Sequence, residues 1–351
     1  MAPETLSPRR LNRALLARQR LLERSADTIP RVLEQVGGLQ TQYAPSGYIG
    51  LWSRAAGFDR PMLTRALEQR TVVQATLMRA TIHLVSAADY WPLTAAIRRT
   101  RREWFERVSR REIDKVDMVS VAEIVRAELS GGPRRMAELE TAVVDTGLPK
   151  RAAGWAGYYV DLVRVPPSGT WERRRADLYG LAEVWLPATG EVAEADGLEL
   201  LLRRYLGAFG PARLDDVASW AGLPPTLLQP TADRLDMRHF RDEQGRELID
   251  LPDAPLPAED TPSQPRFIPT WDAMLLVHAR RTQILPERYR PRVFNTKTPH
   301  SVPTFLVDGQ VAGSWRFDAG EINLEPFETL TADARRELEE EARRLASFHA
   351  D

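Results

Sequence analysis

The sequence predicts a helix-rich α+β fold made of three tandem winged-helix (helix-turn-helix) modules, a β-rich C-terminal part and a C-terminal helix. Two observations support this prediction. First, three helical segments followed by strand-like segments occur three times along the chain, which is the order of elements in a winged helix. Second, 351 residues with 43% hydrophobic side chains suffice for several domains with substantial cores.

The first module is expected over residues 1–92. Ser7 followed by Pro8 is typical of an N-cap and a first helical position, and Pro30 begins the next helix in the same way. Gly37 and Gly38 weaken the end of that second helix. The predicted elements are helices over 8–22, 29–40 and 61–69, a loop over 43–57, and strands over 71–76 and 79–86.

The same order returns over 93–187 and 188–255, which we take as the second and third modules. The second has predicted helices over 117–129, 135–146 and 150–163, a wing turn at Ser168-Gly169 and a strand over 170–179. The third has predicted helices over 197–209, 214–221 and 224–235, then a hairpin over 243–251 that turns at Gln244-Gly245.

The last region, 256–351, is expected to be β-rich. A proline-rich stretch over 252–265 precedes it and predicts a linker or a sheet edge. Asp308-Gly309 is a strong signal for a type I′ hairpin turn. The predicted elements are a strand over 266–269, an Arg- and His-rich segment over 278–292, a hairpin over 304–317, and a charged helix over 332–348 whose apolar stripe (Leu338, Leu345, Phe348) packs back on the body.

The composition excludes several classes of protein. The absence of cysteine rules out disulfides, thiol nucleophiles, iron–sulfur clusters and thiolate zinc sites. The five histidines are scattered without metal-ligand spacing, so we expect no metal and no other cofactor. The longest apolar runs are too short to span a bilayer, and the Arg-studded N-terminus does not resemble a secretory signal. We therefore expect a cytoplasmic protein with no membrane partner.

Charge is unevenly distributed behind a formal net charge of −1. Residues 1–110 hold 18 Arg against 9 acidic residues, whereas residues 181–260 hold 7 Arg against 16 acidic residues. A basic face can bind a polyanion on a neutral protein, because salt screens charges beyond about 10 Å. The densest cluster of arginines fits either phosphate binding or a solvated helix face that is paired with Glu103 and Glu106. It comprises Arg98, Arg99, Arg101, Arg102, Arg107, Arg110 and Arg111.

The chain lacks the common catalytic motifs, including the P-loop, the G-x-G-x-x-G fingerprint, the G-x-S-x-G elbow and H-x-E. Composition alone favours a DNA-binding protein, and a non-catalytic winged-helix transcriptional regulator is the alternative interpretation. Such regulators read the major groove with the third helix of the module. One feature argues against the regulator interpretation. The predicted helix over 224–235 holds Asp233 beside Arg234, whereas a groove-reading helix normally carries more basic and polar residues.

A less common motif, Gly-Gly-Leu-Gln-Thr-Gln-Tyr-Ala-Pro, spans residues 37–45. Gln40 and Gln42, at i and i+2, do not share a helix face, so they converge only if the helix ends between them. The alternative is a polar helix end that caps its own carbonyls. Together with four other segments, this motif resembles the bacterial winged-helix DNA glycosylases of the AlkZ/YcaQ type, in order from Leu11 to Trp315. The other segments are 50–54 (Gly-Leu-Trp-Ser-Arg), 79–86 (Arg-Ala-Thr-Ile-His-Leu-Val-Ser), 209–211 (Phe-Gly-Pro) and 307–315 (Val-Asp-Gly-Gln-Val-Ala-Gly-Ser-Trp).

The resemblance implies an enzyme and its site. The family excises N7-alkylated purines and unhooks interstrand crosslinks, including those of the antibiotic azinomycin in self-resistance. Its catalytic motif is Gln, an apolar residue, then Gln or Asp, which implies that Gln40 and Gln42 are catalytic and that the chain is of the AlkZ-like branch. Thr41 departs from the motif because its methyl group is only partly apolar. We expect a monomer that acts on double-stranded DNA carrying alkylated purines and that is nucleoid-associated when bound.

Two amides suffice for this chemistry because an N7-alkylguanine is cationic and is already a good leaving group. A glutamine carbonyl can accept a hydrogen bond from the attacking water and orient it, but it cannot remove a proton at neutral pH. Bifunctional glycosylases use an amine to form a Schiff base. Only three lysines are present, and none is near the glutamines in sequence, so the chain is expected to be monofunctional, with the N-terminal amine as the alternative nucleophile for lyase chemistry. They are Lys115, Lys150 and Lys297.

Further residues are candidates for supporting roles. Thr81 is a supporting candidate. His83 is a candidate for a contact to the sugar or phosphate, although a hydrogen-bonded core histidine fits it equally well. Arg54 and Arg79 are candidates for clamping phosphates. Tyr43, Tyr48 and Trp52 either stack on exposed bases or belong to the core. Arg280 and Arg281 lie in a C-terminal stretch where structure and site cannot be separated. The DNA-binding candidates are Tyr43, Tyr48, Trp52, Arg54, Arg79, Arg98, Arg101, Arg102, Arg280 and Arg281.

Overall fold

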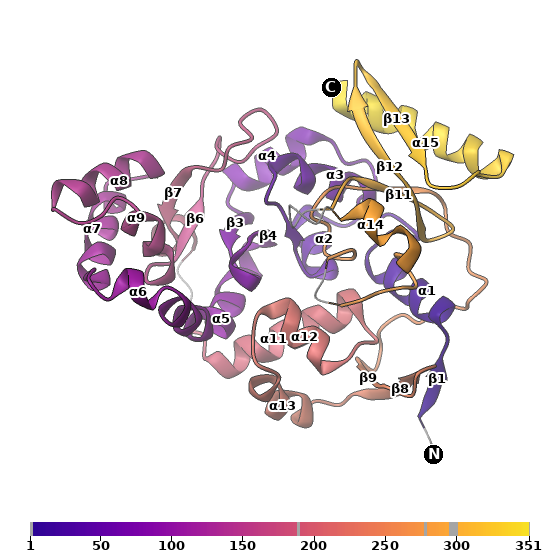
Figure 1. Ribbon diagram of the computed structural model, residues 1–351, viewed down its shortest axis with the longest axis horizontal. Coiled ribbons are helices and arrows are strands. Elements are labelled where there is room, and N and C mark those ends of the chain that lie inside the picture. The colour runs from indigo at the N-terminus through magenta and orange to yellow at the C-terminus, as the bar shows by residue number, and fades with distance from the viewer. Residues whose placement is uncertain (1–2, 188–189, 277–278, 295–300, 351) are drawn as a thin grey trace.

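The structure is a computed structural model that describes residues 3–187, 190–276, 279–294 and 301–350. It shows a mixed α+β architecture, as predicted, in which a central body carries a helical lobe on one side and a strand-rich region with a long helix on the other (Figure 1). In the described part of the chain, no helix is both long and apolar enough to cross a membrane. His278, Lys297 and His300 lie outside the described residues.

The first part of the chain forms the centre of the body. Its elements are β1 (Glu4–Leu6), α1 (Pro8–Arg18), α2 (Ile29–Val36), β2 (Leu39–Gln40), α3 (Ala44–Arg54), α4 (Arg60–Glu68), β3 (Val72–Thr76), the 3-10 turn η1 (Met78–Ala80) and β4 (Ile82–Ser86). The predicted pair of strands is confirmed as the antiparallel β3–β4 hairpin. The N-cap at Ser7 is confirmed by its side chain, which accepts a hydrogen bond from Arg10 N.

Two predictions for this part are wrong. The second helix does not reach residue 40, because Gly37 adopts a left-handed conformation (φ 75°) and ends α2 at Val36. The predicted loop over 43–57 is largely the helix α3, every residue of which is buried. A helix surrounded by core on all sides has no polar stripe, so amphipathic periodicity could not find it.

The second part forms the helical lobe. Its elements are α5 (Ala87–Val108), α6 (Arg110–Ile113), α7 (Met118–Ser130), β5 (Arg134–Arg135), α8 (Met136–Asp145), α9 (Ala152–Trp155), the 3-10 turn η2 (Ala156–Tyr158), β6 (Leu162–Arg164), β7 (Leu178–Leu181) and α10 (Ala182–Trp185). The helix predicted over 150–163 is instead two short turns followed by a strand, and the strand predicted over 170–179 begins only at Leu178. Strands of the first two parts share one sheet in the order β2-β4-β3-β6-β7-β5.

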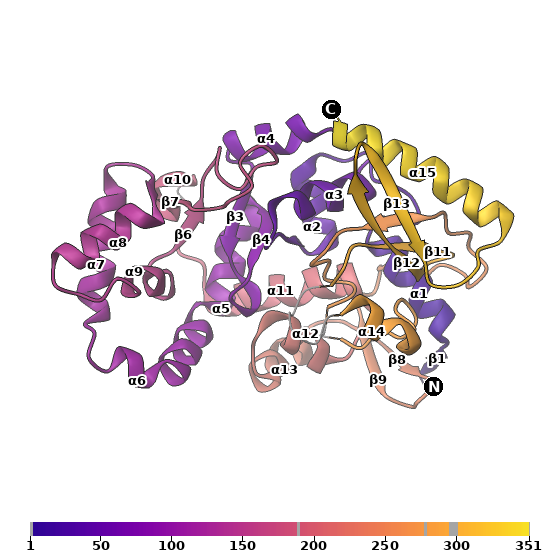
Figure 2. The same ribbon diagram turned by 45° about the horizontal axis from the view of Figure 1, so that its top comes forward.

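The third part packs beneath the body. It holds α11 (Glu194–Phe209), α12 (Leu214–Ala221), α13 (Pro225–Arg234), β8 (Arg238–Asp242) and β9 (Glu247–Asp250). All three predicted helices are confirmed, and the hairpin is longer at its start than predicted. The N-terminal strand β1, which was not predicted, pairs in parallel with β8. Buried residues of α11 and α5 belong to one apolar core, and the figures show the two helices side by side (Figures 1 and 2).

The C-terminal part covers the body from the side opposite the helical lobe (Figure 2). It holds β10 (Arg266–Ile268), the 3-10 turn η3 (Glu287–Tyr289), α14 (Arg290–Val293), β11 (Thr304–Val307), β12 (Gln310–Asp318), β13 (Glu321–Pro326) and α15 (Ala332–Ala350). The predicted hairpin turn is confirmed, since Asp308 and Gly309 both have positive φ, 47° and 79°. The predicted stripe on α15 is also confirmed, because Leu338, Leu345 and Phe348 are buried in the core that contains α2, α3 and α4.

Candidate active site

Gln40 lies on a strand rather than at a helix end. After Gly37, Gly38 also has positive φ (76°), and the chain turns directly into β2, which pairs antiparallel with β4. Gln42 follows two residues later, in a bend beyond the end of β2. Because α2 ends at Val36, before both glutamines, the predicted geometry, a helix that ends between them, is wrong.

Gln40 is buried, and its side-chain oxygen is held by a hydrogen bond from Arg79. Only 5% of the residue is exposed, and its side-chain Oε1 accepts a hydrogen bond of 3.0 Å from Arg79 Nη2. In the sheet register Gln40 lies directly opposite His83. Arg79 and His83 belong to the same short stretch, η1 and the start of β4, so this stretch positions the first amide.

Gln42 is exposed and bound to the same stretch. Thr41 N donates to Ile82 O at 2.8 Å, and Ile82 N in turn donates to the side-chain Oε1 of Gln42 at 2.9 Å. The Gln42 amide thus takes the place of a backbone partner at the point where β2 ends. Both catalytic candidates are therefore fixed against residues 79–83.

The two amides keep the capacity to bind further groups. Each carbonyl oxygen has two lone pairs, and the recorded hydrogen bonds use one of them. Among the residues that the structure describes, neither side-chain nitrogen donates a hydrogen bond. The pair therefore presents N–H donors and one remaining acceptor site on each oxygen, which is what is needed to orient a water and a sugar or phosphate oxygen.

Arg79 anchors the site in a strained turn. It has φ 53°, and the next residue, Ala80, has φ 55°. Such left-handed conformations of residues other than glycine cost roughly 1–3 kcal/mol each and persist only where the surroundings impose them. Nη1 of Arg79 donates to the backbone oxygen of Trp220 at the end of α12, while Nη2 donates to Gln40. The sequence predicts a phosphate clamp at Arg79, but both terminal nitrogens are engaged inside the protein.

Close packing of α12 makes this turn possible. Gly222 follows α12 in a left-handed conformation (φ 76°), and a Cβ there would lie 3.3 Å from both Cα and N of Arg79. Burial lowers the pKa of the Arg79 guanidinium to about 10, so it remains protonated at neutral pH. The cation therefore lies beside Gln40 at physiological pH.

His83 is neutral, and only one of its two ring nitrogens has a hydrogen-bond partner among the described residues. Its Nδ1 lies 3.0 Å from Thr81 O, an acceptor, so Nδ1 carries the proton and Nε2 is the acceptor nitrogen. Nε2 is buried and has no hydrogen-bond partner among the described residues. Burial, together with the nearby charge of Arg79, lowers the pKa of His83 to about 3. His83 is therefore not a proton donor at neutral pH, and Thr81 contributes mainly backbone contacts while its hydroxyl donates to Met78 O.

Burial decides the position of three DNA-binding candidates: it selects the core alternative for Tyr48 and Trp52, and it corrects the predicted contact of Arg54. Arg54 is fully buried and forms an ion pair of 2.8 Å with Asp272. Tyr48, 1% exposed, bonds through its hydroxyl to Thr64, and Trp52 lies in the core. These residues hold the body together. So little of their surface is exposed that they do not reach DNA in this structure.

The remaining candidates are distributed between surface and interior. Tyr43 is 43% exposed and accepts a hydrogen bond from Arg174, so it is available at the surface. Arg280 is exposed and forms a bidentate ion pair with Glu287. Arg281 is buried and donates to the hydroxyl of Tyr205 at 3.0 Å, so its predicted DNA contact is also wrong.

The arginine cluster on α5 and α6 is only partly neutralised. Arg98 pairs with Asp161 at 2.7 Å, and Arg102 pairs with Glu106 at 2.9 Å, so these two candidates have counter-charges. Arg101 turns inward and donates to the backbone of β3 and η2. Three others are exposed and have no ion pair with any described residue, which leaves a basic surface at this end of α5. They are Arg107, Arg110 and Arg111.

Trp104 was missed by the sequence analysis. It is 43% exposed on α5 and lines a cavity of about 300 Å³ next to Arg79. Apolar side chains of Leu77 and Ile97 form much of the wall, and the end of α12 closes it. An aromatic residue inside the run Arg-Arg-Glu-Trp, residues 101–104, was the available signal.

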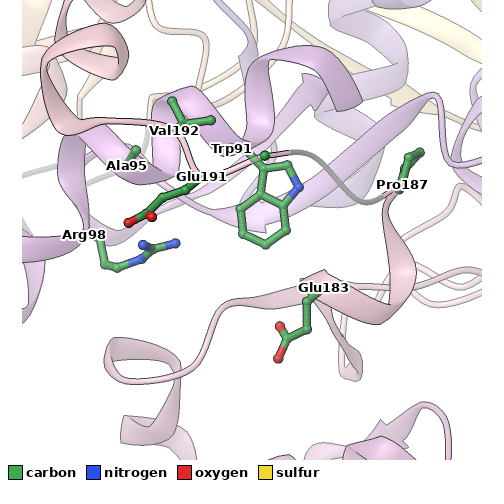
Figure 3. Close-up of a pocket in the computed structure, with 8 residues that line it drawn as sticks. Trp91, Ala95, Arg98, Glu183, Pro187, Glu191 and Val192 are labelled. Carbon is green, nitrogen blue, oxygen red and sulfur yellow. The ribbon is translucent and has the colours of Figure 1, made fainter.

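A separate hollow of about 310 Å³ lies next to the first half of α5, on a different face of this helix from the 300 Å³ cavity, and beside α10 (Figure 3). Figure 3 shows the Glu191 carboxylate directed toward Arg98, with Trp91 nearby, whereas the Glu183 carboxylate is turned away from these side chains. Arg98 and Glu183 already have ion-pair partners, Asp161 and Arg126, so the Glu191 carboxylate makes the hollow unfavourable for a DNA phosphate. Within the described ranges, no group of three or more His, Asp or Glu side chains is arranged to hold a metal ion.

The chain is similar to known DNA glycosylases in sequence and in fold. The model of the AlkZ-like DNA glycosylase family matches residues 33–348. The interstrand DNA cross-link repair glycosylase of Streptomyces sahachiroi is 22% identical, over 94% of this chain and 93% of that protein. The solved structure of the Streptomyces sahachiroi DNA glycosylase AlkZ superposes with a TM-score of 0.82 at 20% identity, over 98% of this chain and 97% of that one.

Proposed function

The chain belongs to the AlkZ-like family of DNA glycosylases, and on that premise we propose that it is a monofunctional enzyme which hydrolyses the N-glycosidic bond of N7-alkylated purines in double-stranded DNA. The observation that carries the proposal is the pair of neutral amides, Gln40 and Gln42, fixed against residues 79–83. An unassisted amide pair is sufficient only when the leaving base is already cationic.

The two glutamines have different roles in this proposal. The guanidinium of Arg79 draws electron density from the Gln40 oxygen and makes it a poorer acceptor for water. Gln42 accepts only a neutral backbone N–H and is exposed, so its oxygen is the better acceptor for the attacking water. Gln40 then uses its amide N–H to hold a sugar or phosphate oxygen.

Hydrolysis is favoured over lyase cleavage because the chain offers few amines. Lys150 pairs with Glu140 on α8, in the helical lobe, and Lys115 lies between α6 and α7 in the same lobe. A Schiff base needs an unprotonated amine beside the sugar carbon. Neither lysine belongs to the elements that position Gln40 and Gln42.

Bulky adducts and interstrand crosslinks are included in the proposed substrates. The Streptomyces sahachiroi relative is named an interstrand DNA cross-link repair glycosylase and aligns over nearly the whole chain. Gln at position 42, rather than Asp, supports placement in the AlkZ-like branch, with self-resistance to an alkylating natural product as the biological role. Family membership does not favour the alternative of a transcriptional regulator.

We also propose that the chain acts as a monomer and that three winged-helix modules, within 1–92, 93–187 and 188–255, precede the C-terminal region 256–351. Each of these modules contains helices followed by antiparallel strands, which supports this division. The sheet that joins β3 to β6 holds the first two modules together.

The reaction is tested with a duplex that contains N7-methylguanine, by measuring release of the free base chromatographically. The parent protein is expected to release it and to leave the abasic strand uncut, whereas Gln40→Ala and Gln42→Ala lose most activity while binding an abasic-site duplex like the parent. Gln229→Ala, an exposed glutamine on α13, is the control. Full activity in the double variant would exclude these residues from catalysis, and strand cleavage by the parent would contradict the monofunctional assignment.

A further inference from the structure

We propose that the cavity between β3, η2 and β6 binds a phosphodiester group of the DNA backbone, with Arg101 and Arg164 as its cations. The identification of the ligand as DNA rests on the proposed function, whereas the affinity of the cavity for a phosphate group does not. The cavity measures about 120 Å³ and lies where the first two parts of the chain meet in the shared sheet. Its lining includes Thr76, Arg101, Arg164 and Tyr179.

Two guanidinium groups meet at Thr76, the last residue of β3. Arg101 donates to the Thr76 backbone oxygen through Nη1 and to Gly157 O at 3.3 Å through Nη2. Arg164 donates to Thr76 Oγ1 at 3.0 Å and lies over the ring of Tyr179. Both cations are thus held in place by neutral groups.

Neither cation is fully satisfied. The Nε atoms of Arg101 and Arg164 are both buried, and neither has a hydrogen-bond partner in the described part of the chain. Burial lowers the pKa of both guanidiniums. Asp161 lines the same cavity, but it forms its ion pair with Arg98 at 2.7 Å. The cavity therefore keeps an excess of positive charge, which is unfavourable unless a bound anion neutralises it.

Size and chemistry favour a phosphate group as that anion. Guanidinium forks match phosphate oxygens in geometry, and a buried site strengthens each charge-assisted hydrogen bond. Two glycines leave the wall open, since a Cβ at Gly154 would meet nothing within 4 Å and one at Gly157 only a leucine methyl at 3.9 Å.

The position of the cavity favours DNA as the source of the phosphate. Thr76 is followed by the turn that holds Arg79 against Gln40, so the cavity lies at the same end of the β3–β4 hairpin as the amides. Arg101 also lines the 300 Å³ cavity beside Arg79. A strand with its lesion at Gln40 and Gln42 would therefore pass the cavity with a neighbouring phosphate.

The test is the salt dependence of binding to an undamaged duplex, measured by fluorescence anisotropy for the parent and Arg164→Gln. Loss of one phosphate contact is expected to reduce the slope of log K against log salt concentration by about 0.9. Arg164→Lys, which keeps the charge, should retain the parental slope. Arg175→Gln is the matched control, because Arg175 has 87% side-chain exposure and pairs with Asp177.

A second measurement separates the site from a general fold defect. In phosphate-free buffer Arg164→Gln should melt at or above the parental temperature, because it removes an unsatisfied buried cation. Added inorganic phosphate should raise the melting temperature of the parent more than that of Arg164→Gln.

An unchanged salt slope in Arg164→Gln overturns the proposal, and phosphate stabilisation of the parent without a slope change assigns the cavity to free phosphate instead of DNA. These readouts need no lesion, so a parent protein that excises nothing would contradict the proposed function and leave this test intact.

Discussion

Arg79 Nη2 donates a hydrogen bond of 3.0 Å to the side-chain oxygen of Gln40, while the other terminal nitrogen of Arg79 donates to the backbone of Trp220. The first amide of the glutamine motif is therefore fixed by a residue from the β3–β4 turn and, through it, by helix α12. The arrangement joins the first and third parts of the chain at the candidate active site.

Arg79→Met should lower the excision rate without weakening DNA binding. Charge-assisted hydrogen bonds contribute about 1.5–3 kcal/mol, so the expected loss in kcat is roughly tenfold to a hundredfold. Single-turnover excision of N7-methylguanine gives the rate, and anisotropy on an abasic duplex gives the affinity. Arg79→Lys should recover part of the rate. A selective loss of affinity would show instead that Arg79 serves DNA binding.

Gly222→Ala should reduce both stability and activity. An alanine with positive φ costs about 1–2 kcal/mol, and its Cβ would press on the Arg79 backbone. Gly245→Ala is a matched control, because Gly245 has the same φ of 76° with nothing within 4 Å of a Cβ. Chemical denaturation should show a loss in both variants, whereas only Gly222→Ala should excise slowly. Equal excision by the two variants would disprove the role of the α12 contact.

His83 should make the protein less stable in mild acid. Its pKa is lowered from 6.5 to about 3 in the folded protein, so below pH 6.5 the unfolded chain takes up a proton that the folded chain does not. The contribution to the unfolding free energy is therefore complete above pH 6.5 and falls by about 1.4 kcal/mol per pH unit well below it. Urea denaturation of the parent and His83→Asn at neutral and mildly acidic pH checks this. Parallel losses in the two proteins would show that His83 is not the buried neutral group.

Arg54→Met should destabilise the fold strongly. Removing one partner of a buried ion pair leaves Asp272 charged in the interior and costs about 3–5 kcal/mol. A second change, Asp272→Asn, should restore part of the loss in denaturant unfolding. If Arg54→Met instead kept its stability and lost affinity for DNA, the predicted phosphate contact of Arg54 would be reinstated.

Local signals in the sequence predicted much of the fold. The helix cap at Ser7, the hairpin turn at Asp308-Gly309, the strands over 71–86 and the apolar stripe on α15 follow from short-range rules that the structure confirms. The rules failed for α3, which is buried on every side, and for the helix predicted over 150–163, which is divided into the short turns α9 and η2 and ends in strand β6. The motif at Gln40 and Gln42 was visible in the sequence, but the position of Gln40 on strand β2 was not.

The sequence by itself determined the family, the residue types at the candidate site and the chemistry that they exclude. Without cysteine, and with few lysines, thiolate metal sites are ruled out and amine catalysis is disfavoured, whatever the fold. Only the tertiary structure decided which arginines are exposed, that Arg79 holds Gln40, and that Arg101 and Arg164 meet at one cavity. The physical reason is that these contacts join residues far apart in the chain, and burial, which local sequence does not encode, determines whether a guanidinium binds DNA, a carboxylate or a backbone carbonyl.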